Sequence, residues 1–339
     1  MLSLMQFDGR KLIISSAVIV AIVIIGIFFF YGLAPASAGK NAMPVVFGVT
    51  QGEKFRTVIG DLRAQGLIRS SFAADTLSII DGAAFRFQPG LYKVNPSASA
   101  WGILGQLTAT PQEITVTIPE GSNIYEIDAI LSNALVIRQG SLISFAASSS
   151  ESEGNLEGRL FPDTYQFFPG TPVQDVIQKL LDNFNAKAGP LLAAAPAATL
   201  MNATSDIIVA SIVEKEVSGA TDQKIVAGII WKRLKAGIPL DVDASICYIK
   251  FQANPTSTAG CLPLTTGDYQ VDSAYNTYLY KGLPPGPIGN PGITAIQAAI
   301  APEATSYWYY LTDPATGKTI YAETLDEQDA NRVRYLKAN

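Results

Sequence analysis

Apolar residues fill positions 12–33 almost without a break, and this run is the clearest pattern in the chain. At about 22 residues it is long enough to cross a lipid bilayer as a helix. Arg10 and Lys11 precede it, and no charged residue follows it closely. Because positive charge is retained on the cytoplasmic side, we expect a cytoplasmic tail at 1–11, a transmembrane helix at 12–33 and an extracytoplasmic remainder.

A cleaved signal peptide would also start with basic residues and an apolar run. Ala36-Ser37-Ala38 resembles the small-residue motif of a cleavage site. Signal peptides, however, have apolar runs of only ~7–15 residues. We therefore favour an uncleaved single-pass anchor in the cell membrane, which contacts lipid through this helix and is followed by a linker at 34–44.

Shorter segments with helical spacing follow the linker and alternate with predicted strands. A turn at Pro89-Gly90 leads into a segment typical of a strand. We interpret residues 45–110 as a small α+β module. Its predicted helices are Phe55–Gln65, Phe72–Ile80 and Ala98–Leu107.

The remainder, residues 111–339, predicts a larger domain in which helices and strands are again mixed. The fold class is therefore α+β, with one N-terminal transmembrane helix, a small module and a mixed α+β domain. Strands are expected at 114–118, 307–311 and 319–321, helices at 124–135, 173–184, 205–219, 222–234, 293–299 and 326–336, loops at 148–154 and 254–268, and a linker or frayed helix at 186–198.

The predicted helix Ser205–Gly219 places a carboxylate on its apolar face. On a helical wheel, Glu216 lies among aliphatic side chains. Glu214 points about 200° away, into a polar arc with Ser211 and Ile207. Acidic side chains are rarely buried without a partner or a function. Glu216 is thus a catalytic acid, a structural acid paired with Arg or Lys, or a residue whose helix is rotated from this wheel.

The composition restricts the available chemistry. The chain has 339 residues, a net charge of −5 and no histidine. The lack of histidine excludes Ser-His-Asp and Cys-His catalysis and most zinc sites, so acid–base chemistry must come from Asp, Glu, Tyr, Lys or Cys. We expect no metal and no cofactor. We also expect no nucleic-acid partner, because no basic block or aromatic-basic stripe is present.

The two cysteines, Cys247 and Cys261, are 14 positions apart and match no CxxC motif. They are either unrelated buried thiols or, in an oxidising compartment, a disulfide. Because both lie on the side that we place outside the membrane, we predict the disulfide.

Residues Gly282–Gly292 contain four prolines and four glycines in eleven positions and can be neither helix nor central strand. Such a rigid loop loses little further entropy when a ligand binds, which suits the wall of a ligand cleft. The alternative is a stiff structural crossover.

Three segments together resemble the MltG/YceG-like endolytic murein (peptidoglycan) transglycosylase family. They are SIVEKE at Ser211–Glu216, EGRLFPDTYQF at Glu157–Phe167 and AYNTYLYKGLPPGPIGNPG at Ala274–Gly292. PLDVDASICY at Pro239–Tyr248 is similar to a diverged form of another family segment. The order and spacing of the segments behind one N-terminal anchor make the resemblance specific.

The resemblance implies a membrane-anchored enzyme outside the cytoplasm that cuts nascent peptidoglycan within its glycan strands and limits their length. Cell-wall synthases are its implied partners beside the strands, and its small module is expected to be LysM-like and to hold the glycan. The second glutamate of the family's E-K-E triplet is catalytic, which implies Glu216. This acid would cleave the MurNAc–GlcNAc bond and leave 1,6-anhydroMurNAc ends without consuming water.

The resemblance also implies roles for neighbouring residues. Tyr275, Asn276 and Thr277 match a Y-N-T block expected to bind sugar or to support the oxocarbenium-like state. Asn290 and the Pro284–Ile288 turn, with Pro285, are expected to line the cleft. Glu214 becomes a structural or secondary polar residue beside Glu216. A hydrolase that uses water would need a second carboxylate, for which Asp243 and Glu214 are the candidates in the nearby sequence; a non-catalytic peptidoglycan-binding protein is the further alternative.

The chain departs from the family at three positions. Val217 replaces a small hydroxyl residue after the glutamate, Ala244 stands where proline is expected after Asp243, and Gln328 stands where histidine is expected near the end. None of these differences removes the acid.

Overall fold

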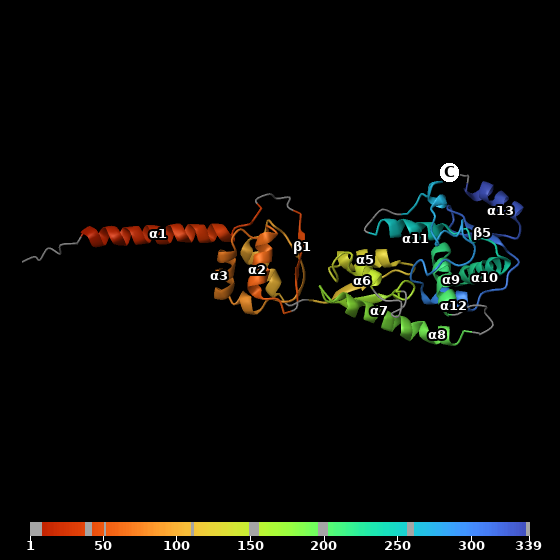
Figure 1. Cartoon of the computed structure of the whole chain (residues 1–339), viewed down its shortest axis with the longest axis horizontal. Helices are drawn as coiled ribbons and strands as arrows, with labels where there is room; N and C mark the ends of the chain where they lie inside the picture. The colour runs from red at the N-terminus through yellow and green to blue at the C-terminus, as the bar shows by residue number, and fades with distance from the viewer. Residues whose placement is uncertain are drawn as a thin grey trace, which may run out of the picture. The chain divides into compact units, whose positions relative to one another are not determined.

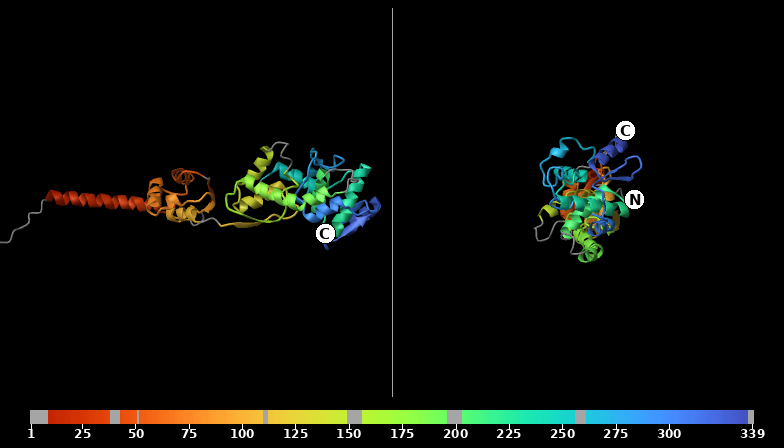
Figure 2. Two further views of the ribbon diagram at one scale, coloured as in Figure 1. Left: turned by 90° about the horizontal axis from the view of Figure 1, so that it is seen from below. Right: turned by 90° about the vertical axis from the view of Figure 1, so that its right-hand side faces the viewer.

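A computed structural model describes residues 9–37, 43–50, 52–109, 112–148, 156–195, 203–255 and 261–336, with side chains from residue 18 onward. The chain divides into two compact units, which we describe separately. Unit 1 comprises residues 1–113 with Phe168–Gly170, and unit 2 comprises Ile114–Phe167 and the chain from Thr171 onward. Both appear in Figure 1 and, from two further directions, in Figure 2.

Unit 1 consists of one two-stranded antiparallel sheet and four α-helices. The strands pair from Val45↔Val94 to Val49↔Gly90, and the side chains between them and the helices form a closed apolar core around Phe47, Leu62 and Ile103. The elements are α1 (Gly9–Leu33), β1 (Val45–Val49), α2 (Phe55–Ala64), α3 (Ser71–Ile80), the 3₁₀ turn η1 (Ala83–Phe85), β2 (Gly90–Val94) and α4 (Ala100–Thr108).

The predicted span at 12–33 corresponds to α1, and its first side chains lie outside the described residues. Within the described part of the chain, none of the helices has both the length and the apolar content needed to cross a bilayer. The predicted tail at 1–11 and loop at 148–154 fall almost wholly outside the described residues, as does part of the linker at 34–44.

Unit 2 begins with an antiparallel ribbon that is covered by three helices. Strand β3 (Ile114–Thr117) pairs with β4 (Thr164–Phe167), from Ile114↔Phe167 to Thr117↔Thr164. The helices are α5 (Ile124–Asn133), α6 (Ser141–Ser148) and α7 (Val173–Lys187). Their apolar faces and the ribbon enclose one core, which includes Ile127, Leu131, Leu160 and Leu180.

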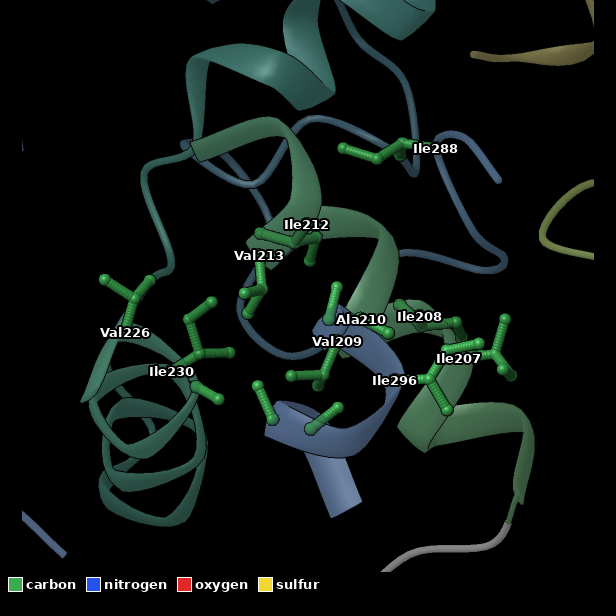
Figure 3. Close-up of a cluster of buried hydrophobic side chains, with 14 of the residues drawn as sticks. Ile207, Ile208, Val209, Ala210, Ile212, Val213, Val226, Ile230, Ile288 and Ile296 are labelled. Carbon is green, nitrogen blue, oxygen red and sulfur yellow. The ribbon is translucent and has the colours of Figure 1, made fainter. Parts of the chain in front are cut away.

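The rest of unit 2 surrounds α9, which is buried on nearly every side. Helices α10 and α12 pack along it, and α8 and α11 contact its two ends (Figure 3). The remaining elements are α8 (Gly189–Ala193), α9 (Ala203–Glu216), α10 (Ala220–Ala236), α11 (Asp243–Ala253), η3 (Asp268–Gln270), α12 (Ile293–Ile300), the hairpin β5 (Tyr309–Thr312) and β6 (Thr319–Ala322), α13 (Leu325–Asn331) and the π-turn η4 (Arg332–Leu336).

The polar arc expected on the central helix was wrong. Ile207 and Ser211 were placed on it, but their exposed fractions are 5% and 0%. Ser211 is accommodated because its hydroxyl donates to the carbonyl of Ile208 and accepts from the N–H of Ile288. The helix also ends at Glu216, before the expected end at Gly219, whose φ of 94° is strongly favoured only by glycine.

Helix α11 was not among the predicted elements, although PLDVDASICY was singled out. Both faces of α11 carry apolar side chains, so no amphipathic period marks it. Of the two alternatives for 186–198, a linker or a frayed helix, the described part agrees with the helix: it contains the end of α7 and the short helix α8.

A close backbone approach beside the central core gives a first prediction. A Cβ added to Gly228 of α10 would lie only 2.1 Å from the carbonyl oxygen of Glu303. We expect Gly228→Ala to lower the free energy of unfolding of unit 2 by about 1–3 kcal/mol, as overpacking does. Gly189→Ala, whose Cβ would meet nothing within 4 Å, is the matched control, and equal denaturant midpoints for the two variants would contradict the prediction.

Candidate active site

A cavity of about 460 Å³ in unit 2 collects acidic, aromatic and aliphatic side chains around the end of α9. Glu216, the last residue of that helix, lines it together with Asp243 and Ala244 from the start of α11. The other lining residues are Asn123, Glu126, Lys215, Cys247, Tyr248, Phe251, Cys261, Leu262 and Ile288. The cavity therefore offers a carboxyl group at a largely apolar wall.

The Glu216 carboxyl is held in a setting that favours its neutral form. Its pKa is raised to about 7, mainly by burial and also by the negative charge of Asp243. Hydrogen bonds from the Tyr310 hydroxyl, at 3.0 Å, and from the backbone N–H of Ala244 act in the opposite direction. A carboxyl group with a pKa near neutrality can donate a proton and take one back at physiological pH.

Asp243 is positioned by the segment that follows α11. Its Oδ1 accepts a hydrogen bond of 2.6 Å from the Tyr278 hydroxyl. Thr277 Oγ1 accepts from the N–H of Val242, one residue before Asp243, and shares a 3.0 Å hydrogen bond with Ser245 Oγ. The side chain of Thr277 thus fixes the first turn of α11, and with it the carboxylate beside Glu216.

Tyr310 reaches Glu216 from the C-terminal hairpin. It lies on β5, and the amide of Gln328 on α13 donates a 3.0 Å hydrogen bond to its carbonyl oxygen. Burial, followed by the charge of Glu216, raises the pKa of the Tyr310 hydroxyl, so it remains a proton donor. Sequence reasoning missed Tyr310, because a strand prediction for 307–311 gives no information about which distant residue a side chain meets.

A second buried carboxyl, Glu157, was also missed as a functional residue although it starts one of the three motifs. It is 3% exposed, and Asn290 Nδ2 and the N–H of Ile124 donate to it at 2.8 and 3.1 Å. The Tyr248 hydroxyl donates as well. Burial raises the pKa of Glu157 to about 7, and these donors and the charge of Lys215 oppose the rise.

Glu157 connects to the cavity through aromatic rings. Tyr248 lines the cavity, and its ring centroid is 4.9 Å from that of Tyr275 and 6.1 Å from that of Tyr125. The hydrogen bond from Tyr248 to Glu157 therefore orients one wall of the cavity. Its place at the start of the segment EGRLFPDTYQF was the signal that the sequence gave for it.

Three residues expected to contact sugar lie inside the protein. Asn276 and Asn290 are 0% exposed and Thr277 is 2% exposed. Asn276 Nδ2 donates to the carbonyls of Tyr269 and Val271. These side chains are enclosed and their polar groups bond the protein itself, and contact of these three residues with sugar stays a prediction. They support the walls of the cavity.

Asn290 joins three segments of unit 2. Its Nδ2 donates to the carbonyl of Ser122 as well as to Glu157, and its Oδ1 accepts from the N–H of Leu160 at 2.7 Å. The adjacent N–H and C=O of Asn290 bond Ser122 and Gly121. The rigid 282–292 loop is thereby tied to the β3–α5 turn, as a structural crossover would be.

The remaining predicted residues occupy different positions. Glu214 is half-buried and accepts a 3.0 Å hydrogen bond from the N–H of Gly292, and burial raises its pKa. It is absent from the described cavity lining, whereas Asp243 belongs to it. Tyr275 is half-buried and Pro285 is exposed; sugar contact by these two residues stays a prediction.

Known proteins share the sequence pattern and the fold. The sequence model of the YceG-like family matches residues 47–334. An endolytic murein transglycosylase of Bacillus subtilis (strain 168) is 26% identical over 341 residues, which cover 93% of this chain and 92% of that protein. A protein of the same name from Streptococcus pneumoniae serotype 2 (strain D39 / NCTC 7466) is also 26% identical, over 97% of this chain but 66% of its own length.

A solved structure adds a comparison of the fold alone. The crystal structure of a protein described as yceG-like from Listeria monocytogenes superposes with a TM-score of 0.53 and 24% sequence identity. The match covers 86% of this chain and 100% of that chain.

Substitutions of the groups around Glu216 should change its pKa in opposite directions. Tyr310→Phe and Ala244→Pro each remove a donor to the carboxylate and should raise the pKa above its value of about 7 in the parent. Asp243→Asn removes a negative charge and should lower it. NMR titration of ¹³C-labelled carboxyl groups, with Glu216→Gln to assign the signal, measures the three values. A shift of the same sign in all three variants would refute this account.

Cys247 and Cys261, which both line the cavity, give a separate prediction about stability. The structure joins them in a disulfide, with the Cα atoms 5.2 Å apart. A closed loop of this length should contribute roughly 3 kcal/mol to the free energy of unfolding in the chain-entropy model. Denaturant unfolding with and without reductant measures this contribution. Two alkylated thiols in the intact mass of non-reduced, natively purified protein would show that the pair does not form.

Proposed function

The chain belongs to the YceG-like family, and we propose that it is a peptidoglycan lytic transglycosylase in which Glu216 is the general acid. Relatives named endolytic murein transglycosylase support the activity. The observation that carries the residue assignment is the Glu216 carboxyl on the cavity wall, with its pKa raised by burial to about 7.

The proposed reaction needs one group that is first an acid and then a base. The protonated carboxyl of Glu216 gives its proton to the oxygen that bridges MurNAc and GlcNAc, and the bond from C1 of MurNAc to that oxygen breaks. The resulting carboxylate takes the proton from the C6 hydroxyl of MurNAc, whose oxygen bonds to C1. This step closes the 1,6-anhydro ring, restores the acid and consumes no water.

The surroundings of Glu216 suit both halves of this cycle. Apolar burial keeps the acid protonated before the first step. The Tyr310 hydroxyl and the Ala244 N–H then stabilise the carboxylate that forms. Because the reactive form is protonated, kcat/KM should fall as the pH rises through about 7.

Asp243 keeps hydrolysis as a second candidate reaction. Glycoside hydrolases use two carboxyl groups that flank the scissile bond, and Asp243 lines the same cavity as Glu216. Glu214 is less suited to be the second group, since its carboxylate is held by the N–H of Gly292 and lies outside the described cavity lining. The products distinguish the two reactions: anhydro ends indicate the transglycosylase, and reducing ends indicate the hydrolase.

We further propose that the enzyme is anchored in the cell membrane by α1 and works outside the cytoplasm on nascent strands, beside cell-wall synthases, so that it limits glycan length. The apolar run and the basic residues before it support the anchor, and the disulfide supports an oxidising compartment. Unit 1 is then the LysM-like module that holds the glycan while unit 2 cuts.

Replacing the acid tests the proposed function. Glu216→Gln keeps the shape of the side chain but cannot protonate the leaving oxygen. General acid catalysis contributes ~10²–10⁴-fold, so we expect at least that loss in the release of 1,6-anhydroMurNAc-ended products from uncrosslinked peptidoglycan. Mass spectrometry of the soluble products measures it, and a thermal melt checks that the fold survives.

Glu214→Gln is the matched control and should retain far more activity. If the Glu216→Gln variant is active and the Glu214→Gln variant is folded but inactive, the general acid is Glu214 and the assignment of Glu216 is refuted. A parent enzyme that releases only reducing ends would be a hydrolase. A parent that releases nothing, even from membrane-embedded nascent strands, would be a non-catalytic binding protein.

A further inference from the structure

Helix α3 of unit 1 has apolar side chains on two opposite faces, and only one of them is used by the core. Ala73, Ala74 and Leu77 are each at most 5% exposed and pack against the rest of the unit. A helix that lies on a protein surface normally presents polar side chains on its outer face. On the outer face of α3 the half-buried Thr76 is polar, whereas the large exposed side chains are apolar.

The outer face presents large apolar side chains to the surroundings. Phe72 and Ile80 are each 75% exposed and Ile79 is 55% exposed. These positions, at i, i+7 and i+8, share one side of the helix. Phe85 in the following 3₁₀ turn is 83% exposed. We call these four residues the α3 apolar face. Large exposed apolar side chains that gather on one side of a helix and in the turn after it are a candidate interaction site.

The C-terminal end of α1 is packed directly against α3. A Cβ added to Gly32 would lie 2.9 Å from Ser70 Cβ and 3.0 Å from Ala73 Cβ, so the two helices touch where this glycine removes the side chain. The short bridge Pro35↔Ile68 continues the contact. In Figure 1, α3 lies at the end of α1, and the strand β1 lies farther along the unit.

The described part of α1 is apolar and exposed like the α3 apolar face. Ile22, Ile25, Phe28 and Phe30 have exposed fractions of 63–72%. Because α1 ends against the N-terminal part of α3, at Ser70 and Ala73, the two helices that carry exposed apolar side chains are in contact. A lipid phase that surrounds the exposed side chains of α1 would therefore also reach the exposed apolar side chains of α3.

Arginines lie at both ends of the α3 apolar face. Arg69 precedes the N-cap of α3, and its guanidinium lies 4.6 Å from the ring centroid of Tyr31 on α1. Arg86 follows Phe85 and is exposed, with its Nη2 on the carbonyl of Asp81. Aromatic and arginine side chains that border an apolar surface are the residues found at the headgroup level of membranes.

From this arrangement we propose that the α3 apolar face rests on the surface of the lipid bilayer, with its side chains among the acyl chains and Arg69 and Arg86 among anionic headgroups. The proposal rests on the membrane anchoring by α1 proposed above. It adds a second contact, which would hold unit 1 against the membrane where α1 leaves it. If a flexible tether were the only connection, unit 1 would be free to move relative to the membrane.

Fluorescent probes on the full-length chain test this contact. The Cys247–Cys261 pair stays oxidised, so a single cysteine introduced at Ile80 can be labelled without reductant. The labelled protein is reconstituted into phosphatidylethanolamine and phosphatidylglycerol vesicles that contain brominated lipid, and quenching by the lipid and by aqueous iodide is measured. We expect loss of fluorescence to brominated lipid at Ile80→Cys and protection from iodide.

Two matched positions complete the experiment. Lys93→Cys lies at an exposed position of β2, in the sheet of the same unit, and should be quenched by iodide and not by lipid. Ile25→Cys on α1 reports the anchor itself. Quenching by lipid at Ile25 but not at Ile80 would overturn the α3 contact and leave the anchor standing.

Other outcomes point to other occupants. Protection of the Ile80 probe from both quenchers would mean that protein covers the face, as a second copy of the chain would, and would refute the lipid contact. Lipid quenching at neither Ile25 nor Ile80 would remove the anchor and the contact together. Release of anhydro ends from soluble glycan by the same samples is scored separately, so a failure of the catalytic proposal is seen on its own.

Discussion

The burial of one carboxyl group at the end of a helix that is buried over most of its length is the constraint on which the rest of unit 2 depends. Glu216 is the last residue of α9, where the partial negative charge of the helix C-terminus adds to the cost of ionisation. Facing it is the start of α11, where Asp243 occupies the first position and the N–H of Ala244 donates to the Glu216 carboxyl. The pKa of Glu216 is thus raised by its place at a helix C-terminus and in an apolar cavity wall, beside a second carboxyl group.

Segments far apart in the sequence hold this arrangement. The C-terminal hairpin brings Tyr310 to Glu216, and Gln328 on α13 fixes the strand that carries it. The 275–280 segment fixes the first turn of α11 through Thr277 and the Asp243 carboxylate through Tyr278. The bond of Thr277 to the N–H of Val242 is enclosed by protein, where a missing partner would cost more than at the surface. The polar network therefore positions the acid, and the aliphatic side chains of α9, α10 and α12 hold the helix that bears it.

The sequence predicted most of the helices and strands, because amphipathic periods mark elements that have one wet face. Phe55–Ala64, Val173–Lys187 and the terminal hairpin agree closely with what was expected. For α9 the helix was predicted but its polar arc was wrong, and α11 was not predicted, because apolar residues lie on more than one side of both helices. The family resemblance singled out Asn276 and Asn290, but it gave no sign that both would be wholly enclosed. Their burial, like the contact of Tyr310 with Glu216, depends on packing between distant segments, which no local pattern encodes.

Two of the departures from the family pattern, Ala244 and Gln328, affect the hydrogen bonds around Glu216. Proline was expected where Ala244 stands, and proline has no N–H. Ala244 supplies that N–H to the Glu216 carboxylate, so this chain has a donor that the expected residue would lack. Histidine was expected where Gln328 stands, and the glutamine amide supports the backbone of Tyr310 without carrying a charge that titrates near neutral pH. Both substitutions act on the partners of the acid. The acid itself is unchanged, so the chemistry is retained while the balance between its neutral and ionised forms is adjusted by its neighbours.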